Sequence, residues 1–283
     1  MKYIVSAENK PYFYWQLELM VESFKRHSQQ SNLIIGLADT ENPHVFPINM
    51  FSVEVMMHRN LGHELNYLPM NKWLAVWTAM KTGRLQPDEQ FVLIDPDMVM
   101  VKPIVPIPAD LNISAQETFM MTLEHINKNK CHIEHHLRAI NKLDAWKPVG
   151  LVYVMQHIPD TFPMRVIEWC HDLIVEQGKA VGTRWWPTEM VATNLTMMEY
   201  NCSIEAKKDY CCILSDPAYC YHFIHYYEPL QMFDKHQWKK CKGSELLMEP
   251  INALLSIDPE ASEAVAYMRD VAESYLKTIG AKQ

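Results

Sequence analysis

The sequence predicts an α/β fold, in which a mixed and mostly parallel β-sheet is flanked by helices and an amphipathic helix ends the chain. Short apolar runs of strand length alternate with helical patterns through the first third of the sequence, an order typical of parallel sheets covered by helices. The 283 residues, 48% of them hydrophobic, suffice for a full globular core. Glycine occurs only 8 times, and the glycine patterns of dinucleotide-binding and P-loop proteins are absent, which argues against both classes.

The first half of the chain carries the clearest secondary-structure signals. Trp15, Leu19 and Phe24 recur at helical spacing, and Gly83 follows a second helical pattern that it would end. We therefore expect helices at residues 12–26 and 71–82 and apolar strands at residues 2–6, 33–37, 51–55 and 91–94, with a second short apolar run after the last of these.

The second half of the chain is less regular. Residues 116–147 are polar and rich in histidine, lysine and asparagine, so we expect one helix with flanking loops there. Farther on, strands are predicted at 148–155, 203–206 and 220–224, and helices at 163–176, from within 185–190, and at 259–279. The last helix places Val265, Met268 and Tyr275 on one face, as an amphipathic helix does.

Two aspartates directly follow the apolar strand predicted at 91–94. Asp95 and Asp97 are separated by Pro96, a residue that suits the end of a strand better than its middle. Residues two apart in an extended chain point to the same side, so both carboxylates can face one point. Paired carboxylates suit Mg²⁺ or Mn²⁺, which usually share their coordination shell with substrate phosphates. The pair resembles the aspartate-x-aspartate signature of nucleotide-sugar glycosyltransferases; the alternative is a solvated acidic turn.

Histidine and cysteine give weaker signals. The run Cys131-His132-Ile133-Glu134-His135-His136 could bind zinc, or it could be a solvated helix face, because no second ligand pair has the spacing of a metal site. The 7 cysteines include no C-x-x-C pair and are expected to be reduced thiols. No apolar run has the length of a membrane span, and the first residues lack the apolar core of a signal peptide. We therefore expect a protein of the cytoplasm, in a bacterium or a phage-infected host cell, with no membrane partner.

Several stretches, in order, resemble the hydroxyproline O-arabinosyltransferases and the related peptidyl-serine galactosyltransferases. They are Tyr14-Trp15-Gln16, Tyr67-Leu68-Pro69-Met70-Asn71-Lys72, Asp95-Pro96-Asp97 through Lys102-Pro103, Trp186-Pro187-Thr188-Glu189-Met190, and Ile224-His225-Tyr226-Tyr227 followed by Phe233-Asp234-Lys235. The resemblance extends over residues 1–240 and implies a GT-A fold, a divalent metal, a UDP-sugar donor and retention of the anomeric configuration. The acidic motif begins with aspartate where the family usually has glutamate, and Trp73 stands where the family has proline. Unlike that family, this protein is expected to have no secretory anchor.

The acidic pair and the resemblance together assign candidate metal ligands. They are Asp95, Asp97 and His225. Asp97 is the expected direct ligand, Asp95 is expected to help hold the metal or the ribose of the donor, and His222 competes with His225 for the third place. A metal held there would stabilise negative charge on the departing UDP, which makes Asp97 a candidate catalytic residue. Lys235 is the candidate contact of the diphosphate, and Lys239 and Lys240 are weaker candidates.

Further candidates concern the nucleotide and the sugar. Ser6, Ala7, Gln16 and Asn71 are candidate donor contacts, the first two near the uracil by analogy with GT-A enzymes. Glu189 is the candidate catalytic carboxylate on the sugar side, as nucleophile or as stabiliser of an oxocarbenium-like centre. A glutamate near a helix start is also favoured by the helix dipole alone, so a structural role stays open.

The expected function is that of a metal-dependent retaining glycosyltransferase, which transfers arabinose, or otherwise galactose or glucose, from a UDP-sugar to an acceptor hydroxyl. The acceptor could belong to a protein or glycan, or to a hydroxymethylated pyrimidine in phage DNA, since the basic run 235–242 suits phosphate contact although the net charge is -8. Alternatives of other classes are a non-catalytic nucleotide-sugar-binding protein and a nucleotidyltransferase. We expect one domain, with a nucleotide-sugar-binding half at 1–115, an acceptor-binding half at 116–243 and a C-terminal helical extension at 244–283.

Overall fold

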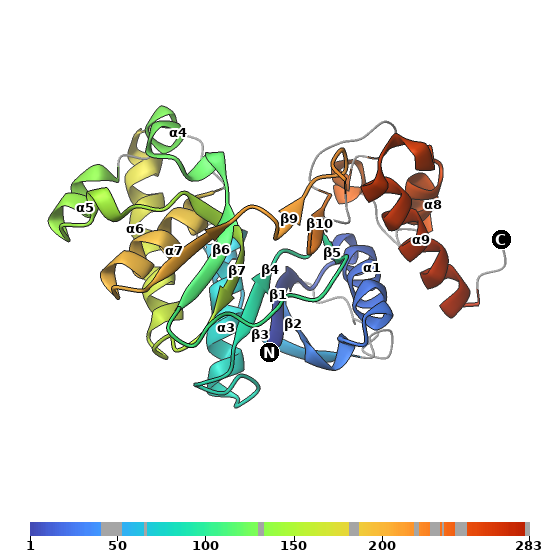
Figure 1. The fold of residues 1–283 in the computed structure, drawn as a ribbon, viewed down its shortest axis with the longest axis horizontal. Coiled ribbons are helices and arrows are strands. Elements are labelled where there is room, and N and C mark those ends of the chain that lie inside the picture. Colours follow the sequence, from blue (N-terminus) through green and yellow to red (C-terminus); the bar gives the residue numbers. More distant parts are fainter. Residues whose placement is uncertain are drawn as a thin grey trace. The chain divides into compact units, whose positions relative to one another are not determined.

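The computed structural model describes residues 1–40, 53–64, 67–129, 133–180, 187–217, 221–226, 233, 235–240 and 248–280, and it has a mixed α/β architecture (Figure 1). The chain divides into two compact units. Unit 1 consists of residues 1–4, 57–93 and 106–208, and unit 2 of residues 5–56, 94–105 and 209–283. Each unit therefore combines segments that are far apart in the sequence.

The main sheet is seven-stranded, with the strand order β3-β2-β1-β4-β7-β6-β8. The strands are β1 Lys2–Glu8, β2 Leu33–Ala38, β3 Glu54–His58, β4 Phe91–Ile94, β6 Ile113–Glu117, β7 Val149–Met155 and β8 Ile204–Lys207. β7 is antiparallel to both β4 and β6, whereas β6 is parallel to β8. The predicted class, a mixed and mostly parallel sheet flanked by helices, is confirmed.

In unit 1, helices cover the strands through packing and hydrogen bonds. The helices are α2 Leu61–Glu64, α3 Asn71–Lys81, α4 Leu123–Lys128, α5 Glu134–Ala139, α6 Phe162–Ala180 and α7 Thr188–Glu199. α6 packs against both α3 and α7; the rings of Trp73 and Phe162 lie 5.4 Å apart between centroids. α7 is tied to β7 because the Asn194 side-chain amide donates a hydrogen bond to the carbonyl of Val149 at 2.7 Å.

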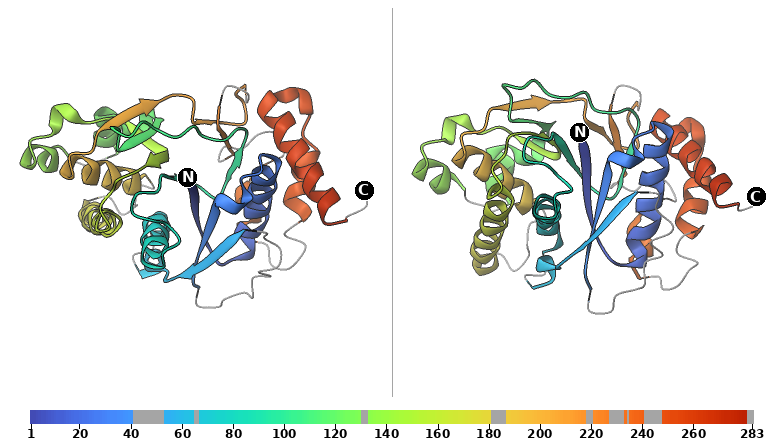
Figure 2. Two further views of the ribbon diagram at one scale, coloured as in Figure 1. Left: turned by 60° about the horizontal axis from the view of Figure 1, so that its bottom comes forward. Right: turned by 90° about the horizontal axis from the view of Figure 1, so that it is seen from below.

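In unit 2, a small three-stranded sheet and three helices surround a second core. The sheet has the order β5-β10-β9, with β5 Met98–Met100, β9 Cys211–Cys212 and β10 Phe223–His225. The helices are α1 Pro11–Arg26, α8 Met248–Leu255 and α9 Glu263–Thr278. α9 lies beside α1 (Figure 2), and an aromatic cluster of Trp15, Tyr226, Phe233 and Trp238 fills the core.

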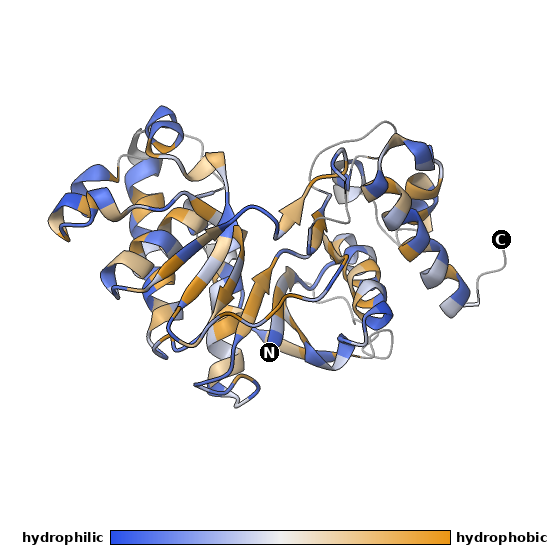
Figure 3. Cartoon of the chain, viewed as in Figure 1, coloured by the Kyte–Doolittle hydropathy of each residue, from blue (hydrophilic) through white to orange (hydrophobic). Residues whose placement is uncertain are grey.

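Between β4 and β5 the chain passes from the main sheet into the small sheet. β4 is apolar along its length (Figure 3) and belongs to the main sheet, whereas β5 pairs antiparallel with β10 in the small sheet. The two apolar runs predicted on either side of Pro96 therefore exist, but they join different sheets.

Several elements differ from the sequence prediction. The polar stretch 116–147 holds the end of β6 and two short helices instead of one helix; β6 escaped detection because its buried positions include polar Ser114 and Gln116. β9 and α8 were also not predicted. The expected C-terminal helix begins later, at Glu263, because the Ser262 side chain caps it by accepting a hydrogen bond from the Val265 N–H. Among the helices that the structure describes, none is long and apolar enough to span a bilayer.

Candidate metal centre

The acidic pair lies in unit 2, where the chain turns from the main sheet into the small one. Asp95 and Asp97 directly follow β4, and both are buried, with 8% and 5% of their surface exposed. The carbonyl of Asp97 accepts a hydrogen bond from the N–H of Tyr226 at 3.2 Å, and the pairing of β5 with β10 sets His225 opposite Met98. The register of the small sheet therefore brings His225 to the acidic pair.

Three ligand atoms converge at this point. The Nε2 atom of His225 lies 3.2 Å from Oδ2 of Asp97 and 4.0 Å from Oδ2 of Asp95, and the three side chains offer ligand atoms within 4.8 Å of one another. Lys235, at the start of a short 3-10 helix (Lys235–Lys240), forms an ion pair with Oδ2 of Asp97. The buried carboxylates thus have two basic side chains beside them, as buried charges require.

The residues present fit a divalent metal ion. Two carboxylates and one imidazole combine oxygen donors that suit Mn²⁺ and Mg²⁺ with one nitrogen donor. His222, the competing histidine, points elsewhere: its Nδ1 lies 2.9 Å from the carbonyl oxygen of Pro103 and 3.3 Å from that of Lys102. Burial lowers the pKa of His222, so its neutral form is favoured. His225 rather than His222 is the histidine that the fold brings to the carboxylates.

The candidate donor contacts fall in both units. Ser6 and Ala7 lie on β1, and Gln16 lies on α1, where its side-chain amide donates to the Tyr12 carbonyl at 3.0 Å; all three are buried parts of unit 2. Asn71 belongs to unit 1. Its side-chain carbonyl accepts a hydrogen bond from the Gly62 N–H at 3.0 Å, and its side-chain amide donates one to the Asn60 side chain at 2.7 Å. Asn71 thus fixes residues 60–62 to the start of α3.

Glu189 lies in the first turn of α7 in unit 1 and is 2% exposed. Its Oε1 accepts hydrogen bonds from Nε1 of Trp73 at 2.9 Å and from the Thr193 hydroxyl at 3.3 Å. Its Oε2 lies 3.4 Å from Nζ of Lys72, and its backbone N–H donates to the Tyr67 hydroxyl at 2.6 Å. The stretches 67–72 and 187–190 therefore meet around one buried carboxylate, a contact that the sequence did not predict.

The network around Glu189 changes the chemistry of its neighbours. Burial, the Cys170 side chain and the carboxylate of Glu189 raise the pKa of Tyr67 well above its usual range, so its hydroxyl keeps its proton at neutral pH. Burial, followed by the nearby carboxylate, likewise raises the pKa of Cys170, which makes its thiol unreactive. Trp185, Trp186 and the side chains of Lys239 and Lys240 lie outside the described residues.

No family model and no curated protein matches the sequence. Among solved structures, the chain is similar to the galactosyltransferase LgtC in complex with donor and acceptor sugar analogs. The sequence identity is 11% and the TM-score 0.47, over 92% of this chain and 98% of that chain. An active-site mutant of LgtC gives 10% identity and the same TM-score and coverage.

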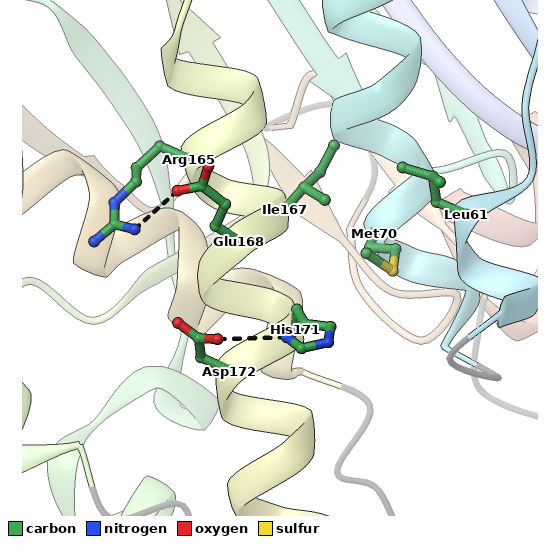
Figure 4. Close-up of a pocket in the computed structure, with 7 residues that line it drawn as sticks. All are labelled: Leu61, Met70, Arg165, Ile167, Glu168, His171 and Asp172. Atoms are coloured by element: carbon green, nitrogen blue, oxygen red, sulfur yellow. Dashed lines mark hydrogen bonds and ion pairs between the residues drawn. The ribbon is translucent and has the colours of Figure 1, made fainter.

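Unit 1 also holds an open pocket of about 490 Å³ beside α6 (Figure 4). Its lining residues are Leu61, Met70, Arg165, Ile167, Glu168, His171 and Asp172. Its charged side chains pair locally: Arg165 with Glu168 at 2.9 Å, and His171 with Asp172 at 3.4 Å. None of the site residues predicted from the sequence lines this pocket, and Arg165 is also engaged by Glu199 at 2.7 Å.

Proposed function

We propose that this protein is a metal-dependent retaining glycosyltransferase that transfers a sugar from a UDP-sugar to an acceptor hydroxyl. The observation that carries the proposal is the convergence of Asp95, Asp97 and His225, whose ligand atoms lie within 4.8 Å of one another at the end of a buried strand. When bound there, Mn²⁺ or Mg²⁺ would supply positive charge to the diphosphate leaving group.

The role proposed for Lys235 follows from its ion pair with Asp97. If Asp97 held a divalent cation, the Lys235 ammonium group would be repelled from it and could pair with diphosphate oxygens instead. Ser6, Ala7 and Gln16, which share unit 2 with the acidic pair, are the proposed contacts of the nucleotide, and Asn71 is a further proposed donor contact.

Glu189 is the proposed carboxylate on the sugar side, with retention of configuration as the expected outcome. Its contacts support a purely structural role equally directly, because Trp73, Thr193 and Lys72 all contact the carboxylate. A nucleophile needs one oxygen available to the anomeric carbon, whereas a structural carboxylate does not. Determining the anomeric configuration of the product by NMR, for wild type and Glu189→Gln, separates the two assignments.

The sugar and the acceptor are proposed from the sequence resemblance and the charge. Arabinose is the first choice and galactose or glucose the next; the acceptor is a hydroxyl of a protein or glycan, or of a hydroxymethylated pyrimidine in phage DNA. The basic run 235–242 supports DNA, whereas the net charge of -8 and the pairing of Lys235 with Asp97 oppose it. Salt-sensitive retention on hydroxymethylcytosine DNA would favour the DNA acceptor, and no retention at low salt would favour the protein or glycan.

The decisive experiment measures UDP release from a panel of UDP-sugars with Mn²⁺, with and without acceptors. Asp97→Asn should lower the rate at least about 100-fold, because loss of a direct ligand exceeds the 10–100-fold cost of losing an outer-shell partner. Asp160→Asn is the matched control, since Asp160 is exposed and pairs only with Lys81 among the contacts described. Full activity in EDTA, or with Asp97→Asn, refutes the proposal. Tight binding of UDP-sugar without turnover would favour the non-catalytic alternative.

A further inference from the structure

A second group of metal-type ligands lies in unit 1, between α5 and α6. His135 and His136 on α5 and Glu176 on α6 each offer one ligand atom, and these atoms lie within 4.8 Å of one another. Nε2 of His136 is 3.3 Å from the Glu176 carboxylate, and the two imidazole rings lie 3.7 Å apart between centroids. Successive residues on a helix normally point in different directions, so helix geometry alone does not explain why both rings face the same carboxylate.

The His136 ring packs against an aromatic side chain that is itself held in place. It packs edge-on against the Trp169 ring at 4.9 Å between centroids. Trp169 is held in turn because its Nε1 donates to Glu199 at 3.0 Å and because the Arg165 guanidinium lies 4.8 Å from its ring centroid. A ligand whose ring is immobilised by packing loses little conformational entropy when it binds a metal.

The cluster is open to solvent. His135 is exposed and lines an open depression of about 490 Å³ together with Asn127, Glu134 and Arg138. Glu134, the one acidic residue of α5, is engaged elsewhere: it accepts a hydrogen bond from Asn127 at 2.8 Å and pairs with Arg138 at 3.6 Å. An ion held by His135, His136 and Glu176 would therefore keep a coordination position for water.

We infer that His135, His136 and Glu176 form a site for a borderline transition-metal ion, Zn²⁺ above all. Two imidazole nitrogens and one carboxylate oxygen are the donors that Zn²⁺ takes in proteins, and three protein ligands leave its fourth tetrahedral position open. Mg²⁺ and Mn²⁺ prefer oxygen-rich sites such as Asp95 and Asp97. The ion would join the short helix α5 to α6, and binding to the folded state stabilises it by mass action. This site is independent of the proposed glycosyltransferase activity.

The test titrates Zn²⁺ into the untagged 283-residue chain carrying Asp97→Asn, which removes one ligand of the acidic site, and follows binding by calorimetry. One equivalent of Zn²⁺ should bind. Combining Asp97→Asn with either His136→Ala or Glu176→Gln should weaken Zn²⁺ binding at least about tenfold. His171→Ala should leave binding unchanged, because His171 is an exposed histidine of α6 outside the cluster. Hydrogen exchange should show Zn²⁺-dependent protection of the amides of α5, a change that a hydrogen bond between His136 and Glu176 would not produce.

Two results would overturn the inference. One is an absence of Zn²⁺ binding at concentrations of about tens of micromolar, the range in which an exposed site with three protein ligands is expected to bind. The other is Zn²⁺ binding that neither His136→Ala nor Glu176→Gln weakens. Because all three ligands lie on partly or fully exposed surface, these variants are expected to fold, and their circular dichroism and thermal unfolding serve as the check.

Discussion

Replacing Glu18 by glutamine should make the free energy of unfolding less dependent on pH, so that the variant gains stability relative to wild type as the pH rises from 4.5 to 7. Glu18 lies on α1, is 3% exposed, and its Oε1 has no hydrogen-bond partner within the described part of the chain. Burial raises the pKa of Glu18 from 4.5 to about 8; Lys25 lowers it and the neighbouring Glu22 raises it. The folded protein therefore holds a proton that the unfolded chain loses at neutral pH.

The sign and size of the effect follow from proton linkage. Below about pH 4.5 the carboxyl is protonated in both states, so Glu18 makes no pH-dependent contribution. Between pH 4.5 and 8 the unfolded state ionises while the folded state does not, and stability falls by about 1.4 kcal/mol for each pH unit. At pH 7 the accumulated penalty is roughly 3 kcal/mol, which glutamine does not incur.

Urea unfolding of wild type and Glu18→Gln at several pH values between 4.5 and 7.5 measures the difference. The uncompensated amide of glutamine shifts the whole curve by about 1–3 kcal/mol, so the decisive quantity is how the difference in free energy of unfolding between the two proteins changes with pH. Glu260→Gln, at an exposed position of the same unit, is the control and should give parallel curves. Parallel curves for Glu18→Gln as well would show that Glu18 is ionised in the folded protein and refute the reasoning.

Three further changes test the two units. Lys235→Ala should tighten Mn²⁺ binding in calorimetry, because it removes the ammonium group that pairs with Asp97. Weaker Mn²⁺ binding would contradict the idea that Lys235 and the metal compete for Asp97. Trp73→Phe removes a hydrogen bond to Glu189 and should lower the free energy of unfolding by about 1–3 kcal/mol while leaving turnover intact. If Glu189 is catalytic, Glu189→Gln abolishes UDP release and Trp73→Phe does not. Gly62→Ala should destabilise by about 1–3 kcal/mol in thermal unfolding, because its Cβ would lie 2.7 Å from the Leu68 backbone; an unchanged Tm would be inconsistent with that close approach.

The sequence predicted the elements whose pattern is local and strong. β4 and β7 are nearly continuous apolar runs, and α1 and α9 repeat apolar residues at helical spacing, so short-range periodicity sufficed. It failed for β6, whose buried Ser114 and Gln116 conceal the strand. It also failed for two-residue β9, which is too short to show a period.

The same limit applied to the side chains of the candidate site. Asp95 and Asp97 were found because both carboxylates belong to one short stretch, and the motifs around Glu189 were found one at a time. Their meeting around Trp73 and Lys72 was not predictable, because packing of α6 against α3 and α7 brings distant segments together.

By itself, the sequence determined the α/β class and the pair of carboxylates at the end of a strand, because both depend on neighbours along the chain. Only the tertiary structure decided which histidine joins that pair, since the pairing of β10 with β5 carries His225 there. It also decided that His135 and His136 meet Glu176 from another helix. Such contacts depend on strand register and helix packing, which couple residues with no fixed separation in the sequence.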